Sequence, residues 1–139
     1  IVYIENQINI IMNTKVKIEL EFPIQASPQL LYNYISTPSG LSEWFADNVN
    51  SRGELFIFIW DDSQEEAKLV SKKSLERIKF KWLENIEDDT FFEFNIQVDN
   101  ITKDVSLIVT DFSDDDEVEE TKMLWENQIS SLKQVLGSR

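Results

Sequence analysis

Residues 113–137, SDDDEVEETKMLWENQISSLKQVLG, decide the fold. Their apolar positions recur every three or four residues, which predicts an amphipathic helix of about twenty residues, roughly 30 Å long. We expect Ser113 to cap this helix, with Asp116 in the capping-box position, and Gly137 to end it. The expected apolar stripe contains Val118, Trp125, Ile129, Leu132 and Leu136, widened by Leu124 and Val135. A stripe of that length must be buried against another element.

Upstream of this helix, short alternating segments predict strands. Residues 15–22 place Val16, Ile18, Leu20 and Phe22 on one face and charged residues on the other. Residues 76–83 and 92–98 alternate in the same way, residues 65–71 do so weakly, and residues 105–112 form the last strand. Residues 54–61 are apolar on both faces, which predicts a central strand covered on both sides. Since every link is too short for a crossover helix, we expect an antiparallel meander of five or six strands.

Two short helices are expected between the first strand and the meander. Ser27 and Pro28 form a typical helix start, and Leu30, Leu31, Tyr34 and Ile35 then recur at helical spacing. The dipeptide at 37–38 ends this helix, and a second begins at Pro38, with Leu41, Trp44 and Phe45 on its apolar side. The element order is therefore strand, two short helices, meander and long helix. This is an α+β chain of helix-grip architecture.

Composition excludes several functions. The 139 residues include no Cys and no His, which removes thiol nucleophiles, thiolate metal sites and the commonest general base. With 26 acidic against 13 basic residues the net charge is −13, so the surface should repel nucleic acids and anionic membranes. We expect neither nucleic-acid binding nor membrane insertion, and the missing Cys favours a cytoplasmic location.

Residues 1–11 are set apart from the rest. They are apolar but lack the basic leading segment of a signal peptide, and Met12 precedes the first regular pattern. We expect residues 1–11 to be an upstream or vector-derived extension and residues 12–139 to be a single domain.

The chain resembles the START-like superfamily, also called SRPBCC. The residues that carry the resemblance are Ser27 and Pro28, the segment TPSGLSEWF at 37–45, Phe80, Lys81 and Trp82, the strand at 105–112, and Leu124 with Trp125. Within the superfamily it is similar to the branch that activates the heat-shock-protein-ninety ATPase. It is most similar to a compact family of Bacteroidetes that shares the segments GLSEWFAD, DFSDDDEVEE and LWENQ. The resemblance covers about residues 15–137 and implies a curved antiparallel sheet wrapped around a long C-terminal helix.

No arrangement of residues indicates catalysis. No base is placed beside a Ser or Thr, and three glycines form no phosphate loop. The paired acids at 61–62 and 88–89 have the composition of solvated turns. The acidic run at 114–120 could bind calcium, but it lacks the spacing and glycine of a calcium hand, and helix capping explains it. We therefore expect no catalytic residue, no metal and no cofactor.

The aromatic residues suggest either a packed core or the walls of a cavity between sheet and terminal helix. If a cavity exists, we expect its lining to include Trp44, Phe58, Trp60, Phe80, Trp82, Phe94, Trp125 and Ile129. Because these positions are apolar, the expected ligand is neutral or amphipathic. The favoured function is a non-catalytic binding module for a small hydrophobic or amphipathic molecule. The alternatives are a cochaperone-like module that binds a protein partner and, third, an SRPBCC-type enzyme.

Overall fold

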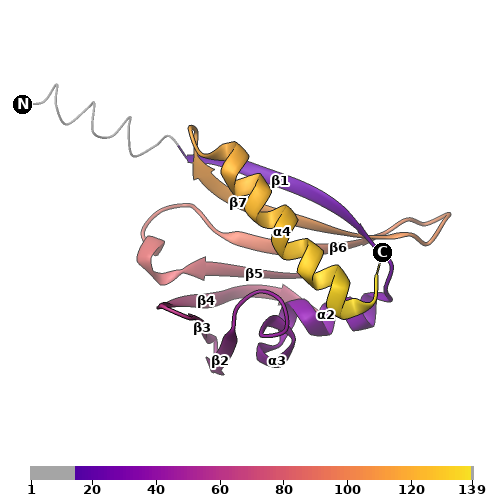
Figure 1. Cartoon of the computed structure of the whole chain (residues 1–139), viewed down its shortest axis with the longest axis horizontal. Coiled ribbons are helices and arrows are strands. Elements are labelled where there is room, and N and C mark those ends of the chain that lie inside the picture. The colour runs from indigo at the N-terminus through magenta and orange to yellow at the C-terminus, as the bar shows by residue number, and fades with distance from the viewer. Residues whose placement is uncertain (1–14, 139) are drawn as a thin grey trace, which may run out of the picture.

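The computed structural model describes residues 15–138, so the prediction for residues 1–11 lies outside the described part. The elements, in chain order, are β1 Lys15–Ile24, α2 Pro28–Ser36, α3 Pro38–Leu41, β2 Asn48–Arg52, β3 Leu55–Trp60, β4 Ser63–Lys73, β5 Arg77–Trp82, the 3-10 helix η1 Leu83–Asn85, β6 Phe92–Val98, β7 Val105–Asp114 and α4 Val118–Leu136. Figure 1 shows α4 lying diagonally across the sheet.

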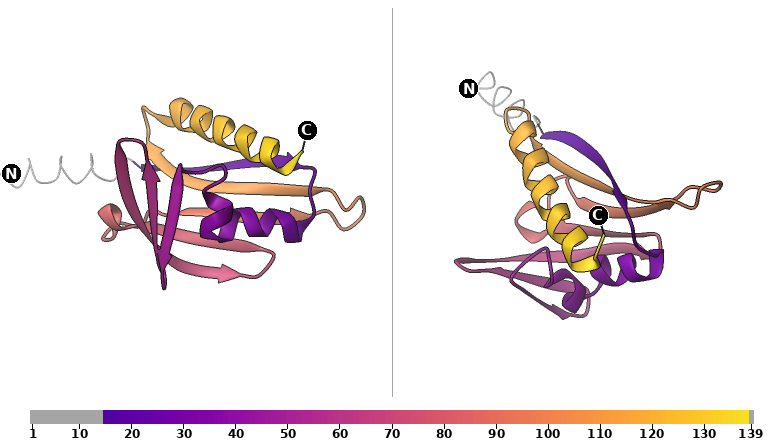
Figure 2. Two further views of the ribbon diagram at one scale, coloured as in Figure 1. Left: turned by 60° about the horizontal axis from the view of Figure 1, so that its bottom comes forward. Right: turned by 45° about the vertical axis from the view of Figure 1, so that its right-hand side comes forward.

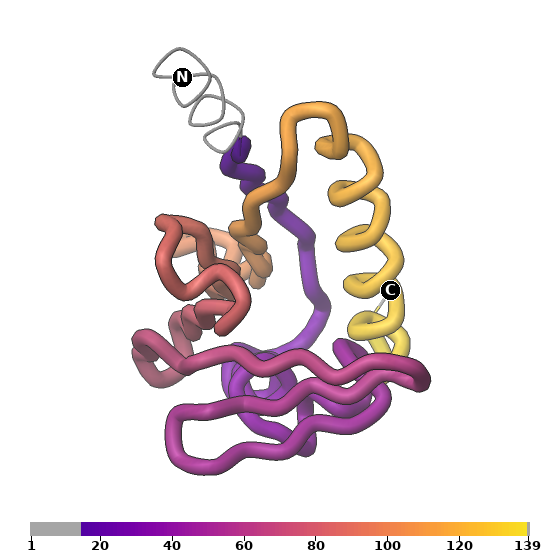
Figure 3. Tube along the Cα trace, turned by 90° about the vertical axis from the view of Figure 1, so that its left-hand side faces the viewer, coloured from indigo at the N-terminus to yellow at the C-terminus, as the bar shows by residue number. Residues whose placement is uncertain are grey.

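All strand pairs are antiparallel, in the order β1-β7-β6-β5-β4-β3-β2. Strands β2 to β7 form the predicted meander, with six strands, and β1 returns to pair with β7. The sheet curves around the helices, and α2, α3 and α4 lie on its concave side (Figures 2 and 3). The predicted α+β helix-grip fold is therefore confirmed. Strand β2, a polar segment, was not predicted, since NVNSR has no apolar alternation.

The core fills the space between the concave face and the helices. Four phenylalanines from β3, β5 and β6 are fully buried there: Phe58, Phe80, Phe92 and Phe94. Helix α2 contributes Leu31 and Ile35, and α4 contributes Trp125, Ile129 and Leu132. The stripe predicted for the terminal helix is thus the surface by which α4 joins the core.

The two short helices begin at capping side chains, as the sequence indicates. Ser27 Oγ accepts a hydrogen bond from the backbone N–H of Leu30 at 3.1 Å, and Pro28 occupies the first turn. Thr37 Oγ1 accepts from the N–H of Gly40 at 2.9 Å and caps α3. Helix α3 ends at Leu41, so Trp44 and Phe45 lie in the turn that follows it rather than on the helix. Both aromatic rings of that turn pack in the core.

The predicted start of the terminal helix was wrong. Ser113 lies in β7, opposite Val16 of β1, and its hydroxyl donates to the carbonyl of Asp114. Helix α4 begins only at Val118, without a side-chain cap. The physical reason is that pairing with β1 keeps the backbone extended through Asp114. Gly137 does end the helix, in the left-handed conformation.

Three other predicted burial patterns were also wrong. Leu124 and Val135 do not widen the buried stripe but remain exposed on α4, and Leu30 is exposed on α2. In β3 only Phe56 and Phe58 are buried, whereas Leu55, Ile57 and Ile59 stay half-exposed. Since successive residues of a strand point to opposite faces, these three lie on the face opposite Phe56 and Phe58, so residues 54–61 are not covered on both faces.

No helix in the described part of the chain is long and apolar enough to cross a membrane.

Candidate functional site

A pocket of about 220 Å³ opens between α4 and the concave face of the sheet. We call it the Trp pocket. Strands β3 to β7, η1, α4 and the turn after α3 all contribute to its wall. The residues that line it are Phe45, Trp60, Glu65, Trp82, Glu84, Phe92, Asp111, Leu124, Trp125 and Gln128.

One wall of the Trp pocket is a continuous set of aromatic rings. Trp82 and Phe92 stack with ring centroids 4.8 Å apart, and Phe45 stacks on both Phe92 and Trp125, at 5.8 and 5.9 Å. Trp60 donates its indole N–H to the carbonyl of Phe45 at 3.2 Å. Each ring is therefore held by a neighbour, so the aromatic wall is formed in advance of any ligand.

A carboxylate lies beside this wall. Asp111 Oδ2 accepts the indole N–H of Trp125 at 2.9 Å, and Asp111 Oδ1 accepts the backbone N–H of Phe112 at 2.7 Å. Burial raises the pKa of Asp111, and this effect outweighs the two hydrogen bonds and the positive charge of Lys15, which lower it. The side chain can therefore exchange a proton at a higher pH than an ordinary Asp.

Two further carboxyl groups lie on the rim. Glu65 comes from β4 and Glu84 from η1, and they are close enough to hydrogen-bond to each other. Burial, the charge of Glu84 and the hydrogen bond with Glu84 all raise the pKa of Glu65. Two acids facing each other favour either a shared proton or a cation between them.

The Trp pocket has little positive charge of its own. None of its ten lining residues is Lys or Arg. Lys15, the cation whose charge reaches Asp111, forms an ion pair with Asp114 at 3.2 Å. In residues 15–138 none of the ion pairs includes Glu65, Glu84 or Asp111. The pocket therefore combines an aromatic wall with unneutralised acids, which differs from the apolar wall expected from the sequence.

The eight residues expected to line a cavity fall into two groups. Trp60, Trp82 and Trp125 line the Trp pocket. The others pack elsewhere. Phe58, Phe80, Phe94 and Ile129 are fully buried in the core, and Trp44 lines an adjoining hollow that shares Phe45, Trp60 and Gln128 with the Trp pocket. Trp44 donates its indole N–H to the carbonyl of Tyr34 at 2.8 Å, which ties that turn to α2.

Sequence reasoning missed the three acids of the Trp pocket. Asp111 continues the alternation of the core residues Leu107 and Val109, and Glu65 lies two residues before the buried Ala67. Both positions therefore carry a signal, since residues two apart in a strand share a face. Glu84 carries no such signal because it lies in η1, which follows the strand and has no alternation.

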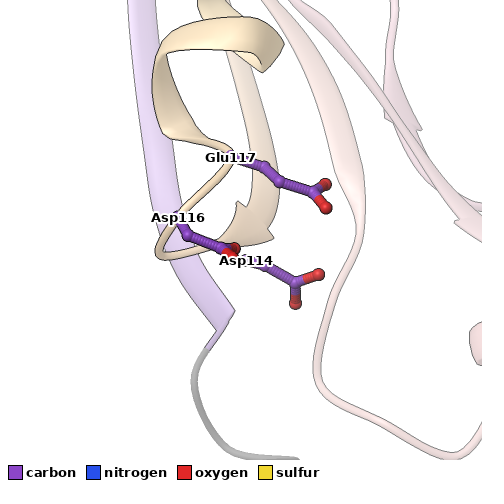
Figure 4. A group of neighbouring side chains, drawn as sticks. All are labelled: Asp114, Asp116 and Glu117. Carbon is purple, nitrogen blue, oxygen red and sulfur yellow. The ribbon is translucent and has the colours of Figure 1, made fainter.

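A second group of acids lies at the connection from β7 to α4. Carboxylate oxygens of Asp114, Asp116 and Glu117 all lie within 4.8 Å of one another, and the three side chains project to the same side (Figure 4). Asp116 and Glu117 are exposed, and Asp114 already pairs with Lys15. The sequence predicted that these acids cap the terminal helix. That prediction was wrong, because α4 begins only at Val118 and has no side-chain cap.

Known proteins similar to this chain share its fold. A family model described as a START-like superfamily domain matches residues 12–138. A protein of Bacteroides fragilis with a solution NMR structure is 36% identical, covers 88% of this chain and 91% of its own, and has a TM-score of 0.65. The Aha1 dimer of Colwellia psychrerythraea is 19% identical, with coverage of 87% and 96% and a TM-score of 0.73. A Cytophaga hutchinsonii protein is 12% identical, with coverage of 91% and 97% and a TM-score of 0.69. No curated protein matches the sequence.

Proposed function

The chain belongs to the START-like superfamily, and from that premise we propose that it is a non-catalytic binding module that holds a small amphipathic molecule in the Trp pocket. One observation carries the proposal: five aromatic rings, from the sheet, α4 and the turn after α3, form one wall of a pocket at the helix–sheet junction. Rings that already pack on one another offer apolar contact at little cost in ordering.

The size of the Trp pocket limits the ligand. Its volume of about 220 Å³ lies below the ~300 Å³ at which sites for drug-sized molecules begin. We propose that one end of an amphipathic ligand enters the pocket while the remainder stays in contact with the exposed Leu124 at its edge. Of the residues expected from the sequence, Trp60, Trp82 and Trp125 are the ones to which this proposal assigns ligand contact.

Competition with a neutral apolar dye tests the proposal. Nile red should brighten on binding to the protein, and Leu124→Trp, which adds bulk at the edge of the pocket, should weaken that binding at least tenfold. Met123→Trp is the matched control because Met123 is the neighbouring residue, is equally exposed and does not line the pocket. Equal loss in both variants, or no dye binding by the unmodified protein, would exclude the Trp pocket as a binding site.

A protein-binding function is the second candidate. Met123 and Leu124 are exposed on α4, 62% and 57%, which leaves an apolar pair on the outside of the helix. A partner of a cochaperone-like module could cover this pair, as the likeness to Aha1 suggests. The two candidates differ in one measurement: Met123→Asp should disrupt a protein complex but leave dye binding unchanged. An enzymatic function is supported only by the half-buried carboxyl of Asp111, a group able to exchange protons.

We place this function in the cytoplasm, as the sequence predicts. Fractionation of the native host, with detection of the protein by antibody, tests that location.

A further inference from the structure

The Trp pocket combines two features that recognise the same chemical group. Trp60, Trp82 and Trp125 present indole rings, and the negative face of an aromatic ring attracts an organic cation. Glu65, Glu84 and Asp111 bring carboxyl groups to the same wall. A neutral apolar ligand would contact the rings but leave Glu65 and Glu84 without a cation, and an anion would be repelled by them.

The acids place negative charge at the Trp pocket itself, with Glu84 exposed on the rim and Glu65 half-buried. Glu65 and Glu84 come from different elements, β4 and η1, yet lie beside each other on the rim. Asp111 is fixed in place by hydrogen bonds from Trp125 and Phe112. The positive charge of Lys15 reaches Asp111, but its ammonium group forms an ion pair with Asp114 rather than with Asp111.

From this arrangement we propose that the Trp pocket selects a small organic cation, a molecule with an ammonium group attached to an apolar body. The inference rests on the proposed binding function and names its ligand class. The ammonium group lies between the carboxylates of Glu65 and Glu84, and the apolar body lies against Trp82 and Phe92. Placing a cation between two like charges removes their repulsion, so binding gains from both the rings and the acids.

Three probes of similar size and different charge test the inference: 2-phenylethylamine, 2-phenylethanol and 3-phenylpropionate. Binding is followed at 0.15 M salt through the indole N–H signals of the four tryptophans in nitrogen-15 NMR spectra. The amine should bind at least about tenfold more tightly than the alcohol, and the carboxylate should not bind. The signals of Trp60, Trp82 and Trp125 should shift, while that of Trp44, outside the pocket, should not.

Charge-removing variants separate the pocket from the general field of an acidic protein. Glu65→Gln and Glu84→Gln together should abolish the preference for the amine while leaving the alcohol unaffected. Neither substitution is expected to unfold the protein, because each removes a charge that is repelled by the acid facing it. Glu126→Gln, on the exposed side of α4, is the matched control and should keep the preference.

Any of the following results would overturn the inference. Equal binding of amine and alcohol would show a pocket that is not selective for charge, and would leave the proposed binding function standing. An amine preference that survives Glu65→Gln and Glu84→Gln would assign it to the general surface charge. Failure of the amine to bind also overturns the inference. If Nile red fails to bind as well, the proposed function falls with it.

Discussion

The indole N–H of Trp125 donates to Asp111 Oδ2 at 2.9 Å. This bond joins the middle of α4 to β7, and it lies in the wall of the Trp pocket. The ring of Trp125 at the same time stacks on Phe45 and contacts Phe94 edge-on. One side chain therefore fixes the helix to the sheet, completes the aromatic wall and orients the half-buried carboxylate of Asp111. Stability and ligand binding should respond together when it is changed.

Trp125→Ala should lower the free energy of unfolding by about 3 kcal/mol or more, the range for large-to-small changes in a core. Trp125 is 4% exposed, so the variant leaves a cavity and removes the donor to Asp111. Denaturant unfolding measures the loss. Leu124→Ala is the neighbouring control and should cost less than about 0.5 kcal/mol because Leu124 is exposed. A loss below about 1 kcal/mol for Trp125→Ala would contradict the assignment of this helix face.

Trp125→Phe separates the hydrogen bond from the packing. The variant keeps a ring against Phe45 but leaves Asp111 without one of its two donors. It should cost about 1–3 kcal/mol, the penalty for a buried polar group that loses a partner. A loss of stability as large as that of Trp125→Ala would show that the phenylalanine ring packs poorly here. Packing would then account for the loss without the hydrogen bond.

Gly40 marks the closest approach of the two short helices. A Cβ at this position would overlap the backbone oxygen of Asn33 and lie 2.6 Å from Tyr34 Cα. Neither backbone atom can move aside, so Gly40→Ala should destabilise the protein by about 2 kcal/mol or more. It should also move the turn that carries Phe45 and so weaken Nile red binding.

Gly53→Ala is the control for Gly40→Ala. Gly53 has a φ of +62° but open space around the position of a Cβ, so only backbone strain of about 1 kcal/mol is expected. Thermal unfolding of the two variants side by side makes the comparison. Equal losses would mean that helix packing at Gly40 is not the constraint.

Most of the fold follows from local periodicity. The alternation in β1, β5 and β6 gives their inward faces, and the stripe of α4 gives its buried side. What periodicity misses depends on partners distant in the chain. Ser113 has the composition of a helix cap, but pairing with Val16 of β1 holds it in a strand. Leu124 is as apolar as its neighbours, yet no described element covers it.

The candidate site was predicted less well than the fold. Its three tryptophans stand out in the sequence, but so do buried rings such as Phe58 and Phe94, and alternation cannot tell a lining ring from a packed one. The acids were overlooked for a different reason. In a chain with 26 acidic residues, a carboxylate at an inward strand position is easily taken for another surface charge. Only the arrangement of β4, β7 and η1 in space brings Glu65, Asp111 and Glu84 together.

Removal of divalent metals should leave the melting temperature unchanged. The acids at the β7–α4 connection include two exposed side chains, Asp116 and Glu117, and a third, Asp114, that already has a partner in Lys15. Dialysis against EDTA followed by thermal unfolding measures the effect, with Asp116→Asn as the control. A drop of several degrees in the unmodified protein, reversed by calcium and absent in Asp116→Asn, would identify a structural calcium site instead.

The stability of the protein should depend on the protonation of Asp111. Burial raises its pKa in the folded state above the ordinary value of 3.8, despite the hydrogen bond from Trp125 and the charge of Lys15. Between these two pKa values the folded state binds more protons than the unfolded state, so the stability contribution of Asp111 falls as the pH rises through this window. Asp111→Asn does not titrate. The free energy of unfolding of Asp111→Asn minus that of the unmodified protein should therefore increase with pH above about 3.8 and then level off. Urea unfolding followed by Trp fluorescence from pH 4 to 8 measures this difference, in which the titration of Glu65 cancels because both proteins share it. A flat difference would mean that folding does not shift the pKa of Asp111, and a difference that decreases with pH would mean that the wall of the Trp pocket stabilises its carboxylate.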